Sequence, residues 1–120
     1  MLASVSTSRL LGAAGGALSW TPTQANLGGS QFFPQYLTLH AGGSMVSAQT
    51  LTITIDDKDG ENYDTLLYTE SIAAGVVDKL YTFPTGLRTG GVESGSLIKV
   101  TLTATGSPEV TVYAKLFYRV

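Results

Sequence analysis

The alternation of apolar and polar residues along three segments is the feature that most limits the fold of this chain. In residues 109–120, EVTVYAKLFYRV, the even positions from Val110 onward form one nearly all-apolar face. Residues 96–105, SLIKVTLTAT, and residues 49–56, QTLTITID, repeat the pattern with threonine and lysine on the opposite face. A period of two places successive side chains on opposite faces of a β-strand, and β-branched threonine suits the exposed face. The three segments are therefore predicted to be half-buried strands.

Further strands are expected near residues 36–40, 65–72 and 79–83, with a short one around residues 17–20. No segment predicts a convincing helix, because residues 72–80, IAAGVVDKL, have Gly75 in the middle followed by two valines. The connector GSPE, residues 106–109, predicts an antiparallel hairpin between the last two strands. Seven or eight short strands joined by glycine-rich connectors predict an all-β fold, an antiparallel β-sandwich of the jelly-roll type.

The chain length of 120 residues fits one domain with its own core. Residues 35–120 are expected to form the β-sandwich domain. Residues 1–34 are rich in glycine and polar residues, and are expected to form an extended N-terminal arm that could be removed without unfolding the sandwich. The arm does not resemble a secretory signal, because Arg9 is its only positive residue and glycines dilute the apolar run after it. No stretch approaches the ~20 apolar residues of a membrane span, so no membrane partner is expected.

Composition excludes several classes of site. The chain has no cysteine, which rules out disulfides, thiolate metal sites and cysteine nucleophiles. Its formal net charge is -2, and its seven lysines and arginines are scattered, so direct binding of nucleic acid is not expected. Charged residues make up only 13% of the chain, about half the usual share. A surface this poor in charge is weakly protected against association, which suggests that a partner covers part of it.

The acidic segment DDKDGENYD, residues 56–64, could be a calcium loop, a catalytic carboxylate pair or a hairpin tip. If Gly60 took the glycine position of an EF-hand, two ligand positions would fall on Ile55 and Leu66, so that pattern fails. A convex, wet loop has no apolar wall to raise the pKa of a catalytic acid. The favoured interpretation is the solvated tip of a β-hairpin with a turn at Asp59-Gly60. A looser calcium site remains open, with the candidate ligands Asp56, Asp57, Asp59, Glu61 and Asp64.

No other constellation indicates catalysis. His40, the only histidine, alternates with Tyr36 and Thr38 on the more polar face of its strand and has no second histidine or cysteine with which to hold a metal. The segments GGSM and SGSL lack the spacing of a nucleophile elbow, and GGVESGS lacks the Lys-Ser/Thr of a phosphate loop. We therefore expect no enzyme activity, no cofactor and no metal centre.

Several apolar and aromatic side chains are candidates for an interface. Tyr113 and Phe117 lie on the outward face of the last strand beside Lys115, and exposed aromatics can stack on sugars or anchor a protein contact. Alternatively, the same residues could pack inside the sandwich and close its core, with no role in binding. The candidate interface residues are Leu10, Leu11, Trp20, Phe32, Phe33, Tyr113 and Phe117.

Residues 51–72, LTITIDDKDGENYDTLLYTESI, followed by residues 91–106, GVESGSLIKVTLTATG, resemble small virion proteins of tailed bacteriophages. In these proteins a strand with outward threonines runs into an acidic, glycine-containing hairpin, and a later strand begins after a glycine-rich loop. The resemblance implies a capsid decoration (cement) or related accessory virion protein, a group that often uses jelly-roll domains in trimers with extended arms. It implies a virion location and, as partner, the major capsid protein or another virion protein. No binding residue is carried over from the family.

The sequence thus favours a non-enzymatic structural virion protein, a homo-oligomer that binds a larger phage assembly through its N-terminal arm and stabilises it. The alternative is a carbohydrate-binding module or the sugar-binding part of a phage adhesin.

Overall fold

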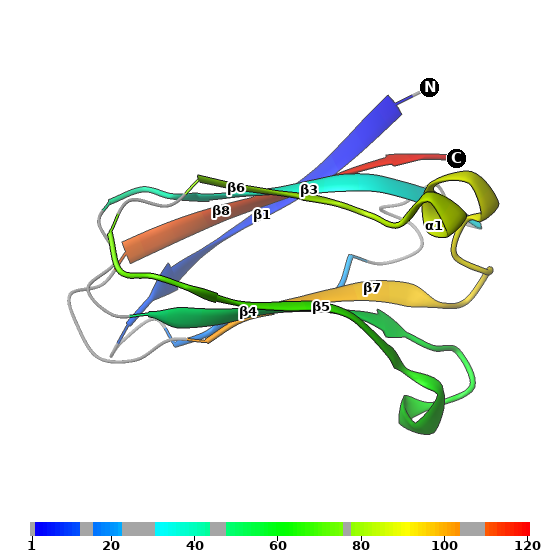
Figure 1. Cartoon of the computed structure of the whole chain (residues 1–120), viewed down its shortest axis with the longest axis horizontal. Helices are drawn as coiled ribbons and strands as arrows, with labels where there is room; N and C mark the ends of the chain where they lie inside the picture. Colours follow the sequence, from blue (N-terminus) through cyan, green and yellow to red (C-terminus); the bar gives the residue numbers. More distant parts are fainter. Residues whose placement is uncertain (1, 13–15, 23–30, 44–47, 76–77, 104–109) are drawn as a thin grey trace.

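The structure, a computed structural model, describes residues 2–12, 16–22, 31–43, 48–75, 78–103 and 110–120, and these residues form two facing antiparallel sheets (Figure 1). Each sheet has four strands, in the orders β1-β8-β3-β6 and β2-β7-β4-β5. We call them the β8 sheet and the β7 sheet. The strands are β1 (Leu2–Leu11), β2 (Leu18–Trp20), β3 (Phe33–Ala41), β4 (Gln49–Asp56), β5 (Thr65–Ile72), β6 (Asp78–Thr82), β7 (Leu97–Leu102) and β8 (Val110–Arg119).

The strand pairing is that of a jelly roll. The first strand pairs with the last, the second with the seventh, the third with the sixth and the fourth with the fifth, as in one long hairpin. Two further pairings, β3 with β8 and β4 with β7, roll this hairpin into two sheets. This nesting is the arrangement expected of an eight-stranded double-sheet jelly roll. The predicted fold class is confirmed.

The core lies between the sheets and is built by the alternation seen in the sequence. On β8, Val112, Ala114 and Leu116 are almost fully buried, and they face Ile98, Val100 and Leu102 of β7. The threonines between the apolar residues of β4 point to the other side and are exposed or half-buried. β4, β7 and β8 therefore contribute their apolar rows to a shared interior, as the period of two predicted.

The predicted boundary between an arm and a sandwich at residue 34 is wrong. β1 pairs with β8 over its full length, from Leu2 opposite Arg119 to Leu11 opposite Val110. β2 pairs with β7, and both Leu11 and Leu18 are buried in the core. The alternation of β1 escaped notice because its outward row is mostly serine and its inward row begins with small residues. Residues 23–30 of the predicted arm lie outside the described residues.

The predicted hairpin between the last two strands is also wrong. β7 and β8 belong to different sheets, and their apolar rows face each other across the core. The turn-forming residues of the connector look the same for a hairpin within one sheet and for a crossing between two sheets, because both connections require a turn. Residues 104–109, which join the two strands, lie outside the described residues.

The sequence predicted no helix, whereas the structure has an α-helix, α1 (Thr85–Gly90), and a 3-10 turn, η1 (Glu61–Tyr63). A six-residue helix with glycine at two positions is too short for an apolar period to be read. After α1 the chain turns at Gly91, which has a φ of 81°. A Cβ atom on Gly91 would lie 2.8 Å from the Phe33 ring and 2.9 Å from the Phe32 carbonyl oxygen, so the turn requires glycine. Among the described residues, no helix has the length and apolar character needed to cross a bilayer.

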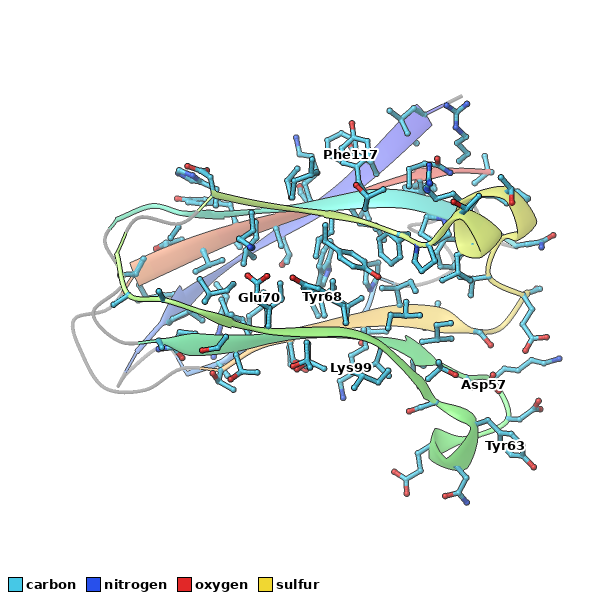
Figure 2. The ribbon with its side chains drawn as sticks, in the orientation of Figure 1. Asp57, Tyr63, Tyr68, Glu70, Lys99 and Phe117 are labelled. Atoms are coloured by element: carbon cyan, nitrogen blue, oxygen red, sulfur yellow. The ribbon has the colours of Figure 1, made fainter. Side chains whose placement is uncertain are left out.

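A polar cluster that the sequence did not predict joins the two sheets where β5 and β6 form their edges. Figure 2 shows Tyr68 and Glu70 between the sheets. The Tyr68 hydroxyl donates a hydrogen bond to Glu70, and Lys79 Nζ of β6 lies 2.5 Å from the other Glu70 oxygen. Hydrogen bonds from Lys79 and then Tyr68 lower the pKa of Glu70, while the bond to Glu70 raises the pKa of Lys79. The cluster ties together two edges that have no backbone pairing with each other.

Candidate functional site

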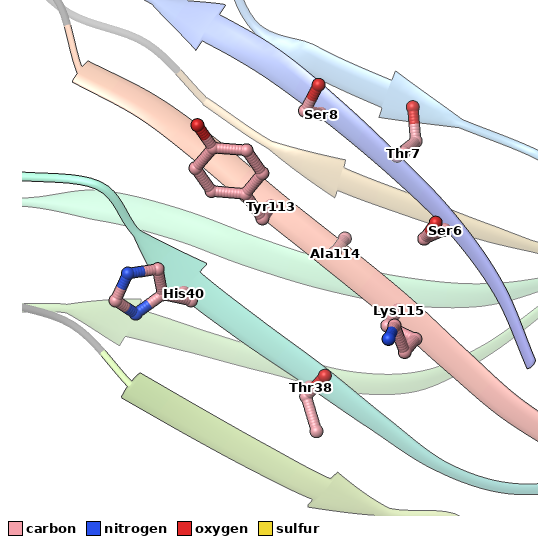
Figure 3. A pocket seen from close by; sticks show the side chains of 8 residues that line it. All are labelled: Ser6, Thr7, Ser8, Thr38, His40, Tyr113, Ala114 and Lys115. Carbon is pink, nitrogen blue, oxygen red and sulfur yellow. The ribbon is translucent and has the colours of Figure 1, made fainter.

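The outward side chains of the β8 sheet form a surface that we call the β8 face. The strand register arranges them in rows that cross β1, β8 and β3. One row contains Ser6, Lys115 and Thr38, and the next contains Ser8, Tyr113 and His40 (Figure 3). A third row contains Ser4, Phe117 and Tyr36. Because outward residues recur every second position, the alternation of the sequence dictates which side chains share this face.

Aromatic rings are packed together on the β8 face. The Tyr36 and Phe117 rings stack with centroids 4.4 Å apart and an interplanar angle of 24°. Lys115 Nζ lies 5.8 Å from the centroid of the Phe117 ring, within the range of a cation–π contact. The His40 and Tyr113 rings lie side by side with centroids 6.2 Å apart. These ring contacts hold outward side chains of neighbouring strands against one another, so the surface is preformed before a partner binds.

A groove of about 500 Å³ runs over this face between β1 and β3. Figure 3 shows Tyr113 and His40 at one end and Lys115 and Thr38 at the other, with the hydroxyl groups of β1 along the side. Its volume lies within the range of ~300–1,000 Å³ for small-molecule sites. Its lining residues are Ser6, Thr7, Ser8, Thr38, His40, Tyr113, Ala114 and Lys115.

His40 forms a polar pair with Asp78 on the β8 face, but the serine of its row lies too far away to be activated by it. Its Nδ1 lies 2.6 Å from Asp78 Oδ1 of β6, an arrangement that resembles two members of a hydrolase triad. Ser8 lies in the same row, but Tyr113 of β8 stands between them. Two strand spacings amount to about 10 Å, far beyond the hydrogen bond that would activate a serine.

Apolar side chains extend the β8 face at both edges of the sheet. Tyr113 is 51% exposed, Leu10 of β1 is 40% exposed and Leu80 of β6 is 64% exposed. Leu80 lies opposite Thr38 of β3, so it continues the row that contains Lys115. Leu80 was not among the predicted interface residues, although its place in an alternating strand could have indicated an outward position.

The predicted interface residues divide into three groups. Leu10 and Tyr113 are exposed, as an interface requires, while Phe117, Phe33 and Trp20 are half-buried. Leu11 and Phe32 were wrongly included, because the structure places both in the core. The Phe32 ring packs edge-on against Tyr118 with centroids 6.5 Å apart. The error follows from the arm prediction, which left these residues without a sheet to pack on.

The acidic segment is the connection of a β-hairpin, as predicted, since β4 and β5 pair antiparallel on either side of it. Its carboxylates have a structural use that the sequence did not reveal. Asp64 Oδ1 accepts a hydrogen bond of 2.8 Å from the Asp57 amide, and Asp57 Oδ1 accepts one of 2.9 Å from the Asp59 amide. Gly60 adopts a φ of 115°, so glycine carries the turn while Asp59 keeps a negative φ. These side-chain bonds replace backbone partners at the tip.

Only two of the five candidate calcium ligands come together. One carboxylate oxygen of each of Asp57, Asp59 and Glu93 lies within 4.8 Å of the others. Glu93 follows α1 and is distant in sequence, so the local pattern could not indicate it. Lys58 Nζ lies 3.9 Å from Glu93 and offsets part of the negative charge. This group is the one acidic cluster of its kind among the described residues, and it is largely exposed.

No protein-family model and no curated protein matches the chain. One solved structure with which the fold superposes is the structure of infectious bursal disease virus Gx strain, at 18% sequence identity and a TM-score of 0.39. The superposition covers 100% of this chain and 32% of that chain, so the present chain spans about a third of its length. A TM-score this low carries no argument about function, and the jelly-roll assignment rests on the strand order. The comparisons do not show the tailed-bacteriophage family that the sequence resembles.

Proposed function

We propose that the protein is a non-enzymatic structural component of a virion, of the capsid decoration or cement type, that attaches to a larger particle through its β8 face. The observation that carries the proposal is the exposure of Leu10, Leu80 and Tyr113 around a stacked aromatic pair on one sheet face. Aromatic residues set among apolar and hydroxyl groups are typical of the contact surfaces of protein partners. The phage resemblance of residues 51–72 and 91–106 and the scarcity of charge support the same function.

The mode of attachment differs from the sequence expectation. Residues 2–11 and 18–20 belong to the two sheets and are not available as a free arm. The β8 face serves as the attachment surface instead, because its apolar side chains lie on strands that are already ordered before binding. A preformed surface avoids the backbone entropy of about 1–2 kcal/mol per residue that an arm would lose.

Co-sedimentation with virions assembled without this protein tests the proposal. The variant Tyr113→Glu places a charge at the centre of the β8 face and should abolish binding to the particle. The matched control is Thr69→Glu, which places the same charge on the exposed outer face of the other sheet and should bind normally. Undiminished binding of Tyr113→Glu, with both variants folded, would reject attachment through this face.

The alternative function is carbohydrate binding, as a binding module or as the sugar-binding part of an adhesin. The groove beside Tyr113 favours it, since an exposed ring flanked by hydroxyl groups and a lysine suits a sugar. A glycan array separates the two functions. Reproducible binding to a sugar that is lost in both Tyr113→Ala and Phe117→Ala would support the carbohydrate function over attachment to a particle.

A further inference from the structure

The two sheets have four edge strands, and three of them carry features that discourage pairing with another chain. β2 has three residues, and β6 has five, among them Asp78 and Lys79. β5 contains Glu70 and a register shift in its pairing with β4. Short length, charge and irregularity are the usual protections of an edge strand. β1 has ten residues and one charge, that of Arg9, and its described sheet neighbour is β8 on one side.

The sequence of β1 is complementary to itself. Its outward residues from 2 to 10 are leucine, three serines and leucine, an order that reads the same in both directions. Ser6 is the central residue of this row. We propose that β1 pairs antiparallel with β1 of a second copy of this chain, about a two-fold axis at Ser6. A two-fold interface of this kind places each residue opposite its counterpart from the other end of the strand.

The proposed pairing covers the apolar ends of the outward row. Leu2 is 42% exposed and Leu10 is 40% exposed. In the two-fold register, Leu2 of each copy lies opposite Leu10 of the other, so two leucine pairs form at the ends of the contact. The serines between them lie opposite serines, and their hydroxyl groups can hydrogen bond across the strands.

The inward row of β1 also accepts this register. Val5 of one copy lies opposite Thr7 of the other, and both are β-branched residues that suit cross-strand packing. Arg9 lies opposite the small Ala3 of the other copy. The two Arg9 side chains are then six positions apart, which is about 20 Å along the strands, so no like charges meet. A one-residue slip would lose the leucine pairs, and this fixes the register.

The pairing would join two β8 sheets into one continuous sheet of eight strands, with both β8 faces on the same side. The inference deepens the self-association expected of a virion protein and takes its biological meaning from the proposed function. The two can fail separately, since cross-linking reports the strand pairing and co-sedimentation reports attachment to the particle.

Cysteine cross-linking of the full chain tests the pairing, because the chain has no cysteine of its own. In the variant Ser6→Cys, the two introduced thiols lie directly opposite each other across the two-fold axis. Opposed residues of antiparallel strands have Cα atoms about 4.5–5.5 Å apart, which a disulfide can span. We expect Ser6→Cys to form a covalent dimer under mild oxidation. Ser71→Cys, an exposed outward position on edge strand β5, is the control and should remain monomeric.

A mixing experiment tests the register. Ser4 and Ser8 lie opposite each other only in different copies, so Ser4→Cys alone and Ser8→Cys alone should not cross-link. Two copies of Ser4→Cys would hold their thiols about 14 Å apart. A mixture of the two variants should give a covalent heterodimer. A dimer of the unmodified chain should also weaken about tenfold or more in Ser6→Lys, measured by sedimentation equilibrium, because two like charges would meet at the axis.

Circular dichroism confirms that each variant is folded, so every outcome is informative. A folded Ser6→Cys that stays monomeric under oxidation overturns the proposal. Cross-linking of Ser4→Cys by itself overturns the register. A dimer or trimer whose stability is unchanged by Ser6→Lys would place self-association on another surface and would also overturn the proposal.

Discussion

Deletion of residues 1–30 removes β1 and β2, one strand from each sheet, and we expect the remaining chain not to fold cooperatively. Leu11 is 4% exposed and Leu18 is 3% exposed, so both are core side chains. Truncating a buried leucine to alanine costs about 2–5 kcal/mol, and two such losses amount to about 4–10 kcal/mol. The whole stability of a domain is about 5–15 kcal/mol. The deletion also removes the ten-residue pairing of β1 with β8. The free energy of unfolding of the remaining chain is therefore expected to be close to zero or negative.

A single-residue version gives a measurable magnitude, because Leu10 and Leu11 are consecutive residues of one strand with opposite orientations. We expect Leu11→Ala to lower the free energy of unfolding by about 2–4 kcal/mol, since the cavity forms in the core. Leu10→Ala should lower it by less than ~1 kcal/mol, because Leu10 is 40% exposed. Urea unfolding followed by circular dichroism checks both values, at a protein concentration low enough for the monomer to predominate.

The truncated chain provides the decisive comparison. If a chain beginning at residue 31 unfolds in one sharp transition at the same urea concentration as the full chain, then β1 and β2 are not structural parts of the sandwich. Equal costs for Leu10→Ala and Leu11→Ala would mean that the orientation of β1 is wrong. Either result would return the N-terminal residues to the status of an arm.

Three further predictions follow from particular contacts. Gly91→Ala should destabilise the fold by about 1–3 kcal/mol in thermal unfolding, because it strains a positive φ and brings a Cβ atom against an aromatic ring, whereas Gly90→Ala, which meets nothing within 4 Å, should be neutral or slightly stabilising. Lys79 lowers the folded-state pKa of Glu70, so the stability that ionised Glu70 contributes is fully present above its usual pKa near 4.5 and is lost as the pH falls through the folded-state pKa. The unfolding midpoint of Glu70→Gln should therefore change less with falling pH than that of the unmodified chain. Equal slopes of midpoint against pH for the two chains would contradict this. Asp59→Asn should change stability by less than ~1 kcal/mol because the side chain is exposed, and millimolar calcium should leave the melting temperature unchanged; a rise of many degrees that a chelator reverses would show a calcium site.

Prediction of the β8 face from sequence was partly successful. Tyr113 and Phe117 were placed on the outward face of the last strand because alternation is a local property that can be counted along the chain. Their neighbours across the strands could not be identified, since the pairing of β8 with β1 and β3 joins segments that are distant in sequence. The groove between these strands was therefore invisible to the sequence, as was the contact of His40 with Asp78.

The sequence by itself determined seven of the eight strands, and for β4, β7 and β8 it determined which side carries the core, because the period of two is fixed by the geometry of a single extended segment. It also favoured a hairpin tip for the acidic segment, because Asp59-Gly60 lies between two alternating segments. Only the tertiary structure decided that residues 2–11 are a strand, since the apolar residues of β1 fall on both of its faces and do not mark a buried side until β8 is placed beside it. Only the tertiary structure decided that β7 and β8 lie in opposite sheets, because a turn has the same local chemistry whether the chain returns to the same sheet or crosses to the other. Sheet membership is settled by which apolar rows meet across the core, and that depends on all eight strands together.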